Sequence, residues 1–93
     1  MKAKDFIKSR LSYISDKIPG IGIRYAYDKK TSFHIIEVYP ESVRRGDNIY
    51  MEFEYCLLQE FHSLFPAEDL LISEIDSTND MSNLILRKHQ PMK

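Results

Sequence analysis

The sequence predicts an α+β fold: a two-layer sandwich in which two helices cover one face of a three- or four-stranded antiparallel sheet. Two segments carry apolar residues at helical spacing, and the other segments are short and rich in β-branched and aromatic residues. Each helical segment has one apolar stripe, so both helices are expected on the same face of the sheet. With 93 residues, the whole chain is expected to form a single domain.

The first helix is predicted over residues 3–18. Its apolar side chains recur every three or four positions and therefore share one face. Pro19 and Gly20 follow as a stop signal. The apolar stripe contains Ala3, Ile7, Leu11, Ile14 and Ile18.

A β-hairpin is predicted next, formed by residues 21–28 and 33–39 around a polar loop. The first strand alternates between apolar and polar positions, which is typical of a strand with one covered face. The second strand has apolar residues on both faces, with Ile36 on one and Ile35 on the other. This pattern indicates that both faces of the second strand are covered.

A long helix is predicted over residues 47–65, after a connection, residues 40–46, that has room for one helical turn. Asp47 or Asn48 supplies the N-cap, and Pro66 ends the helix. The predicted apolar stripe contains Ile49, Phe53, Leu57, Phe61 and Leu64, with Tyr50 and Cys56 beside it.

The remaining sequence predicts one or two further strands. Residues 69–75 are expected to form the third strand, and residues 83–88 form a short fourth strand in the four-stranded version. The segment between them, residues 76–80, consists of turn-forming residues without glycine. The last five residues, 89–93, are expected to be a frayed tail.

The composition is that of a folded globular protein, with 43% hydrophobic and 29% charged residues. The single cysteine, Cys56, excludes an internal disulfide and is interpreted as a small buried hydrophobe. The histidines lack the helical spacing of a metal site, so neither a metal nor a cofactor is expected. No stretch reaches the roughly 18 apolar residues of a membrane span, and a cytoplasmic location without a membrane partner is expected.

Charge is distributed unevenly along the chain, although the net charge is only −1. Residues 1–47 contain ten Lys or Arg against six Asp or Glu, a net of +4, whereas residues 48–93 contain three against eight, a net of −5. Two interpretations stay open. The molecule has a basic and an acidic side, or the two halves neutralise each other across the fold.

Two carboxylates on the long helix are candidates for acid–base chemistry. Glu54 and Glu60 lie on or beside the apolar arc, where a carboxylate needs a cation or several donors. Six positions separate them, which points them apart, so separate ion pairs are the alternative. Asp28 and Glu37 resemble the acidic pair of restriction-like metal-dependent nucleases, but Tyr39 stands where those enzymes have lysine. We therefore expect no enzymatic activity and name no catalytic residue.

Two surfaces are candidates for binding a macromolecule. The long helix has a wider apolar arc than one small sheet covers, and exposed aromatic and methionine side chains are typical of protein interfaces. The alternative is that this arc fills the groove between the other helix and the sheet. The candidate interaction surface contains Met51, Tyr55, Leu58, His62 and Phe65. The candidate basic patch for nucleic acid contains Lys29, Lys30, Arg44 and Arg45.

The sequence thus favours a small interaction domain that binds an unknown protein partner or a second copy of itself. Its candidate binding surface is the helix of residues 47–65 together with the acidic C-terminal half. Nucleic-acid binding through the basic patch is one alternative, and a small enzyme that uses Glu54 and Glu60 is a second.

A loose pattern runs through the middle of the chain: Phe33-His34-x-x-Glu37-x-x-Pro40, then Asp47, Tyr50, Glu54, Phe61, Phe65, Pro66 and Ser73. In this pattern the segment of residues 25–76 resembles small bacterial α+β proteins of unknown function. The resemblance implies a bacterial, cytoplasmic protein with the same strand–helix–strand order. It transfers no activity and no catalytic residue.

Overall fold

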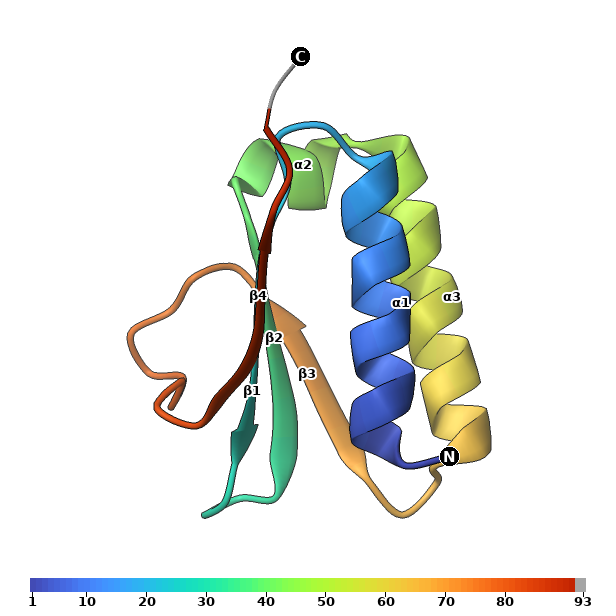
Figure 1. Cartoon of the computed structure of the whole chain (residues 1–93), viewed down its shortest axis with the longest axis vertical. Coiled ribbons are helices and arrows are strands. Elements are labelled where there is room, and N and C mark those ends of the chain that lie inside the picture. Colours follow the sequence, from blue (N-terminus) through green and yellow to red (C-terminus); the bar gives the residue numbers. More distant parts are fainter. Residues whose placement is uncertain (92–93) are drawn as a thin grey trace.

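The computed structural model describes residues 1–91 of the chain. The elements in chain order are α1 (Ala3–Lys17), β1 (Gly22–Asp28), β2 (Phe33–Tyr39), α2 (Glu41–Gly46), α3 (Asn48–Leu64), β3 (Asp69–Ser73) and β4 (Leu84–His89). The two long helices, α1 and α3, lie side by side on one face of the sheet, and the short α2 lies at the end of β2 (Figure 1). The predicted α+β class, with both long helices on one face, is therefore confirmed.

The sheet is mixed, with the strand order β3-β2-β1-β4. β1 pairs antiparallel with both β2 and β4, but β3 pairs parallel with β2. The prediction of a purely antiparallel sheet was wrong because α3 carries the chain back along the full length of β2. The chain then enters β3 at the end where β2 begins, so the two strands run in the same direction.

The main core lies between the helices and the sheet. Alternate residues of β1 and β2 point toward the helices, and Ile23, Tyr25 and Ile36 among them are fully buried. Ile7 and Leu11 of α1 are buried in the same core, in agreement with the predicted apolar stripe. Burying such side chains removes apolar area from water, which is the main force that holds the two layers together.

The apolar stripe of α3 is rotated from the predicted one. The buried residues of this helix are Tyr50, Leu57 and Phe61, whereas Ile49 is exposed. Cys56 is exposed as well, so its interpretation as a buried hydrophobe was wrong. Burying the Tyr50 ring removes more apolar area from water than burying Cys56, and the helix turns that side toward the sheet.

The loop of residues 74–83 covers part of the other face of the sheet. β3 and β4 are the two edge strands, so the chain has to cross the sheet between them. The loop makes this crossing on the side away from α1 and α3 (Figure 1). Ala26 and Ile35, which lie on this face, are buried, and the expectation that β2 is covered on both faces is confirmed.

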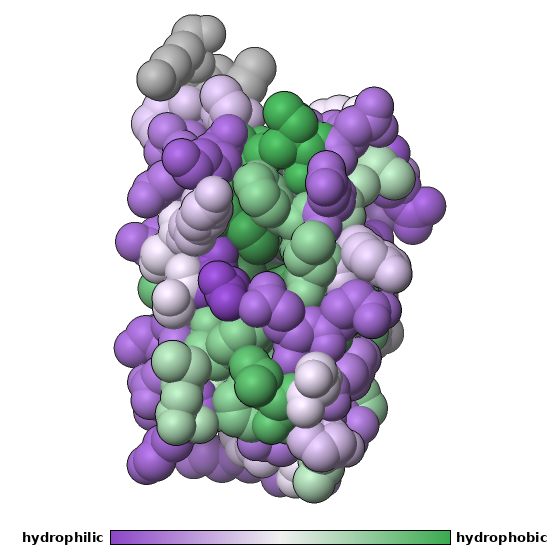
Figure 2. Space-filling model, turned by 90° about the vertical axis from the view of Figure 1, so that its right-hand side faces the viewer, coloured by the Kyte–Doolittle hydropathy of each residue, from purple (hydrophilic) through white to green (hydrophobic). Residues whose placement is uncertain are grey.

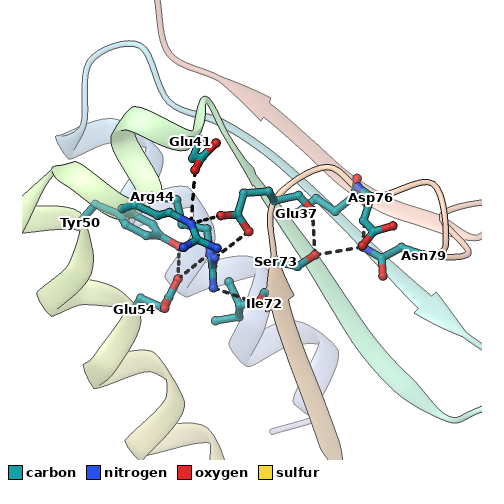
Figure 3. A network of polar contacts seen from close by, with 11 residues as sticks. Glu37, Glu41, Arg44, Tyr50, Glu54, Ile72, Ser73, Asp76 and Asn79 are labelled. Carbon is teal, nitrogen blue, oxygen red and sulfur yellow. Dashed lines mark hydrogen bonds and ion pairs between the residues drawn. The ribbon is translucent and has the colours of Figure 1, made fainter.

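Glu37 holds the loop from the centre of the sheet. Its side chain is 0% exposed, and its carboxylate forms an ion pair with Arg24 on the neighbouring β1. Oε2 of Glu37 accepts hydrogen bonds from the backbone amide of Asp76 at 3.1 Å and from Nδ2 of Asn79 at 2.9 Å (Figure 3). Nδ2 of Asn79 also donates to Oγ of Ser73 at 3.0 Å. One carboxylate therefore joins β1, β2 and the crossing loop.

These hydrogen bonds keep the Glu37 carboxyl ionised. Burial acts to raise its pKa, but the hydrogen bonds from Asn79, Asp76 and Arg24 prevail and hold the pKa below its ordinary value of 4.5. The stability that depends on this ionised group is therefore present above pH 4.5 and is lost as the pH falls below it.

Two aspartates shape the turns of the loop, as its composition predicted. Oδ1 of Asp76 accepts a hydrogen bond from the amide of Thr78 at 2.8 Å, and Oδ1 of Asp80 accepts one from the amide of Ser82 at 3.0 Å. The hydrogen bonds from Thr78 and Ser82 hold the pKa of each aspartate below its ordinary value of 3.8. The loop thus bends through side-chain hydrogen bonds rather than through glycine.

The end of β4 is tied to the start of β1. β4 reaches His89, and the amide of Gln90 donates to the carbonyl of Ile21 at 2.8 Å while the amide of Gly20 donates to the carbonyl of Gln90 at 2.8 Å. The backbone pairing therefore extends into the segment that was expected to be a frayed tail. Residues 92–93 of that segment lie outside the described residues. In residues 1–91 no helix is both long and apolar enough to cross a membrane.

Gly22 leaves room for an aromatic ring on the sheet. It pairs with Tyr39 across β1 and β2, and the Tyr39 ring occupies the space that a Cβ at position 22 would need. Stacking of an aromatic ring over a strand glycine compensates for the missing side chain.

Replacing Gly22 with Ala should lower the free energy of unfolding by about 1–3 kcal/mol, because the Tyr39 ring has to move away. Urea denaturation of the Gly22→Ala, Tyr39→Ala and double variants measures the coupling between the two positions. In the Tyr39→Ala background the same change should cost less than about 0.5 kcal/mol, since alanine suits a strand better than glycine does. Additive costs would show that the ring does not set the requirement for glycine.

Replacing Glu37 with Gln should lower the free energy of unfolding by about 2–4 kcal/mol near pH 7. The change leaves Arg24 without its counter-charge and places the NH₂ group of the new side chain opposite that of Asn79. The difference from the wild type should shrink below pH 4.5, where the wild type loses the same charge. Urea denaturation at a series of pH values measures this. Glu52→Gln, which removes an exposed carboxylate on α3, is the matched control and should give a nearly constant difference.

Candidate functional site

The two arginines of α2 are engaged by carboxylates. Arg44 donates from Nη1 to Glu74 at 2.8 Å and from Nη2 to the carbonyl of Ile72 at 3.1 Å (Figure 3). Its Nε lies 3.4 Å from Glu54. Arg45 forms an ion pair with the same Glu74 and holds the pKa of that carboxyl below its ordinary value. The α2 cluster, defined as Glu41, Arg44, Arg45, Glu54 and Glu74, therefore has three carboxylates for two guanidiniums.

Glu54 and Glu60 have separate partners. The hydroxyl of Tyr50 donates to Glu54 at 2.7 Å, and burial together with Glu54 raises the pKa of that hydroxyl, which stays protonated. Glu60 forms an ion pair with Arg10 of α1, with Nη2 and Oε2 2.7 Å apart. The two carboxylates are thus not brought together as an acid–base pair. Separate ion pairs, the alternative to an acid–base pair, are the arrangement that the structure has.

The candidate basic patch is divided between two ends of the molecule. Lys29 and Lys30 lie in the turn between β1 and β2, whereas Arg44 and Arg45 follow the far end of β2. The length of β2 separates the two pairs, and the arginines are held in the α2 cluster. The four side chains therefore do not form one continuous cationic surface.

Four of the five candidate interaction residues share one side of α3. Met51 and Tyr55 are 46% and 64% exposed, His62 is exposed, and Leu58 is half-buried. These four residues are called the α3 flank below. Phe65 instead packs against the core, with its ring centroid 5.4 Å from that of Phe61. Beside the flank, Met51, Tyr55 and Leu58 border a hollow of about 590 Å³ together with residues of the α2 cluster.

The outer face of the helix layer carries further apolar groups. Figure 2 shows two apolar patches on this face with polar groups between them. Tyr13 of α1 packs edge-on against Phe53 of α3, with their ring centroids 5.6 Å apart. The ion pair between Arg10 and Glu60 also joins the two helices.

Opposite charges of the two sequence halves meet across the fold. Arg10, Arg44 and Arg45 from the basic half pair with Glu54, Glu60 and Glu74 from the acidic half. Of the two interpretations of the uneven charge, mutual neutralisation describes these pairs. Three of the eight acidic side chains of residues 48–93 are therefore paired with arginines of the basic half.

A polar chain that the sequence reading missed lies between the sheet and the end of α3. The hydroxyl of Tyr25 is 2.7 Å from Nδ1 of His34, and Nε2 of His34 is 2.7 Å from Oε1 of Glu68. His34 is buried on β2 and packs against Phe61 and Tyr27. Glu68 precedes β3, and its side chain is 43% exposed. A buried histidine thus links a buried phenol to a carboxylate at the surface.

The direction of this chain follows from the tyrosine. Burial, together with the nearby Glu68 carboxylate, raises the pKa of the Tyr25 hydroxyl, so it stays protonated. Toward a neutral imidazole, the protonated Tyr25 hydroxyl donates to Nδ1 of His34, and the ring proton then lies on Nε2 and is donated to Glu68. Both ring nitrogens of His34 therefore have a hydrogen-bond partner, and the carboxylate of Glu68 is held in position.

A pocket of about 680 Å³, called the α1 pocket below, opens in front of this polar chain at the amino end of α1. Its size falls in the range of small-molecule sites. Besides the polar chain, the lining residues include Lys2, Lys4, Tyr27, Phe65, Asn83 and Ile85.

No family model, no curated protein sequence and no solved structure matches the chain. Within the part of the chain that the structure describes, no three His, Cys, Asp or Glu side chains come together as metal ligands. The α3 flank and the α1 pocket are therefore the two candidate binding sites of the described residues.

Replacing Tyr25 with Phe should lower the free energy of unfolding by about 1–3 kcal/mol, because Nδ1 of His34 is then buried without a donor. Long-range ¹H–¹⁵N NMR spectra should show the Nε2-protonated imidazole in the wild type and a changed tautomer balance in the variant. Tyr27→Phe is the control, since the Tyr27 hydroxyl has no hydrogen bond within the described residues, and it should be nearly neutral. Equal costs for both variants would contradict the assigned role of Tyr25.

Proposed function

We propose that the chain is a protein-binding domain in which the α3 flank receives a basic, amphipathic segment of another protein. The observation that carries this proposal is the exposure of Met51 and Tyr55 beside the hollow at the α2 cluster. Met and Tyr are enriched at protein interfaces, because Met adapts its shape and Tyr buries a large ring while keeping a polar group in water.

The charge around the α3 flank favours a basic partner. The adjoining α2 cluster has one carboxylate more than its two guanidiniums neutralise. Glu52 is exposed one turn before Tyr55, and no Lys or Arg follows α2 in the chain until Arg87 in β4. A cationic side chain that approaches the flank therefore meets excess negative charge, which aids both encounter and orientation.

A second copy of the chain suits the flank less well. A twofold contact places the same surface on both subunits, so the excess negative charges of the two α2 clusters would repel each other. Nucleic acid also fits less well, because phosphates need free cations and Arg44 and Arg45 are held by carboxylates. A cytoplasmic location, expected from the sequence, is part of the proposal.

Peptide selection against the whole chain tests the proposal. Peptides selected from a random display library should carry Lys or Arg beside apolar residues, and their affinity should fall as salt is added. Tyr55→Ala should weaken the best selected peptide by about tenfold or more, as the loss of a central interface tyrosine does.

Tyr13→Ala is the matched control, since Tyr13 is an exposed tyrosine on the other helix. It should leave the affinity within about twofold, because single surface changes away from an interface have small effects. Selected peptides without basic residues, equal effects of the two variants, or no selective enrichment would each contradict the proposal. Light scattering distinguishes a peptide partner from a second copy of the chain. Self-association through α3 predicts a dimer that Tyr55→Ala dissociates.

A further inference from the structure

The α1 pocket is lined by charged side chains of both signs. Lys2 and Lys4 line it from the amino end of α1, and Glu68 lines it from the segment before β3. One oxygen of Glu68, Oε1, is bound by His34, whereas Oε2 has no hydrogen bond within the described residues. The pocket therefore offers one carboxylate oxygen to a donor and two ammonium groups to an anion.

The carboxylate is held in position before any ligand arrives. His34 is only 4% exposed, and its ring is fixed by the hydroxyl of Tyr25 on one side and by ring contacts on the other. A group held in this way loses little freedom when it binds a ligand, which raises the affinity that one hydrogen bond can provide. Glu68 is thus a preorganised acceptor at the mouth of the pocket.

The pocket also has apolar and aromatic lining residues. Tyr27, Phe65 and Ile85 line the pocket and are half-buried, so each keeps part of its surface free. The ring centroid of Tyr27 lies 5.0 Å from that of His34, which gives the pocket a continuous aromatic side. Asn83 adds one neutral amide.

We propose that the α1 pocket binds a small zwitterion of the amino-acid class with an apolar side chain. The ammonium group is received by Oε2 of Glu68, and the carboxylate is received by Lys2 and Lys4. The apolar side chain packs against Tyr27 and Phe65. A ligand with only one of the two charges leaves either Glu68 or the two lysines without an ionic partner, so both charges are needed for full affinity.

This inference does not depend on the proposed function. The α1 pocket is lined by residues at the amino end of α1, whereas the hollow beside the α3 flank is lined by residues of α2 and α3. The amino end of α1 and the α2 helix lie at opposite ends of the helix layer (Figure 1). Loss of peptide binding at the α3 flank and loss of ligand binding in the α1 pocket are therefore separate results.

NMR titration of the isotope-labelled whole chain with L-phenylalanine tests the inference. The signals of Tyr27 and His34 should shift in a saturable way with a Kd of about 1 mM or lower. Two matched compounds each lack one charge: phenethylamine has no carboxylate, and 3-phenylpropanoate has no ammonium group. Both should bind about tenfold more weakly or worse.

Two variants assign the charges to residues. Glu68→Gln keeps an acceptor for His34 but removes the charge, so it should weaken L-phenylalanine about tenfold and leave 3-phenylpropanoate unchanged. Lys2→Gln combined with Lys4→Gln alters exposed side chains and should weaken both carboxylate-bearing compounds but not phenethylamine. This second variant keeps the test decisive even where the first fails to fold.

Three results would overturn the inference. The first is the absence of saturable shifts with L-phenylalanine up to about 10 mM, ten times the expected Kd. The second is equal affinity for L-phenylalanine and either single-charge compound. The third is an unchanged affinity for L-phenylalanine in both variants.

Discussion

The architecture depends on one buried carboxylate. Because β3 and β4 are opposite edges of the sheet, the chain has to cross a sheet face to pass from one to the other. Glu37 lies beneath this crossing and accepts hydrogen bonds from Asp76 and Asn79 of the loop and from Arg24 of β1. A buried carboxylate without these donors is costly, so the strands and the loop have to be in place together. The β3–β4 loop is in this sense part of the sheet.

Ion pairs likewise connect the two halves of the sequence across the fold. The basic half of the sequence supplies Arg10 and Arg44, and the acidic half supplies Glu60 and Glu74 as their partners. Exposed pairs such as the first contribute little stability individually. Their main effect is to determine which charges stay free for a partner: the surplus near α3 is negative, and this is the basis for proposing a basic partner.

Much of the fold could be predicted from the pattern of apolar residues. Helical and alternating periodicities predicted α1, β1, β2 and α3 to within one or two residues, and apolar residues on both faces of β2 predicted its burial. The direction of β3 was missed although a helix between two strands favours parallel pairing. The stripe of α3 was misplaced because the pattern gave Tyr50 no more weight than Cys56, whereas the larger ring gains more from burial.

The candidate sites were only partly accessible from the sequence. Hairpin symmetry places Tyr25 and His34 on the same sheet face, so their contact could have been found by pairing the two predicted strands. Glu68 comes from a connection whose path no periodicity defines, and its contact with His34 needed the structure. The same holds for Glu37, whose loop partners lie 39 and 42 positions away along the chain.

Whether Glu37 holds the loop on the sheet is tested most directly by an NMR pH titration of the Glu37 carboxyl carbon, with simultaneous detection of the Asp76 and Asn79 amide signals. Glu37 should titrate below its ordinary pKa of 4.5, and the backbone amide of Asp76 and the side-chain amide of Asn79 should shift with the same midpoint. A carboxyl that titrates at or above 4.5 while both amide signals stay constant would contradict the claim that Glu37 holds the loop on the sheet.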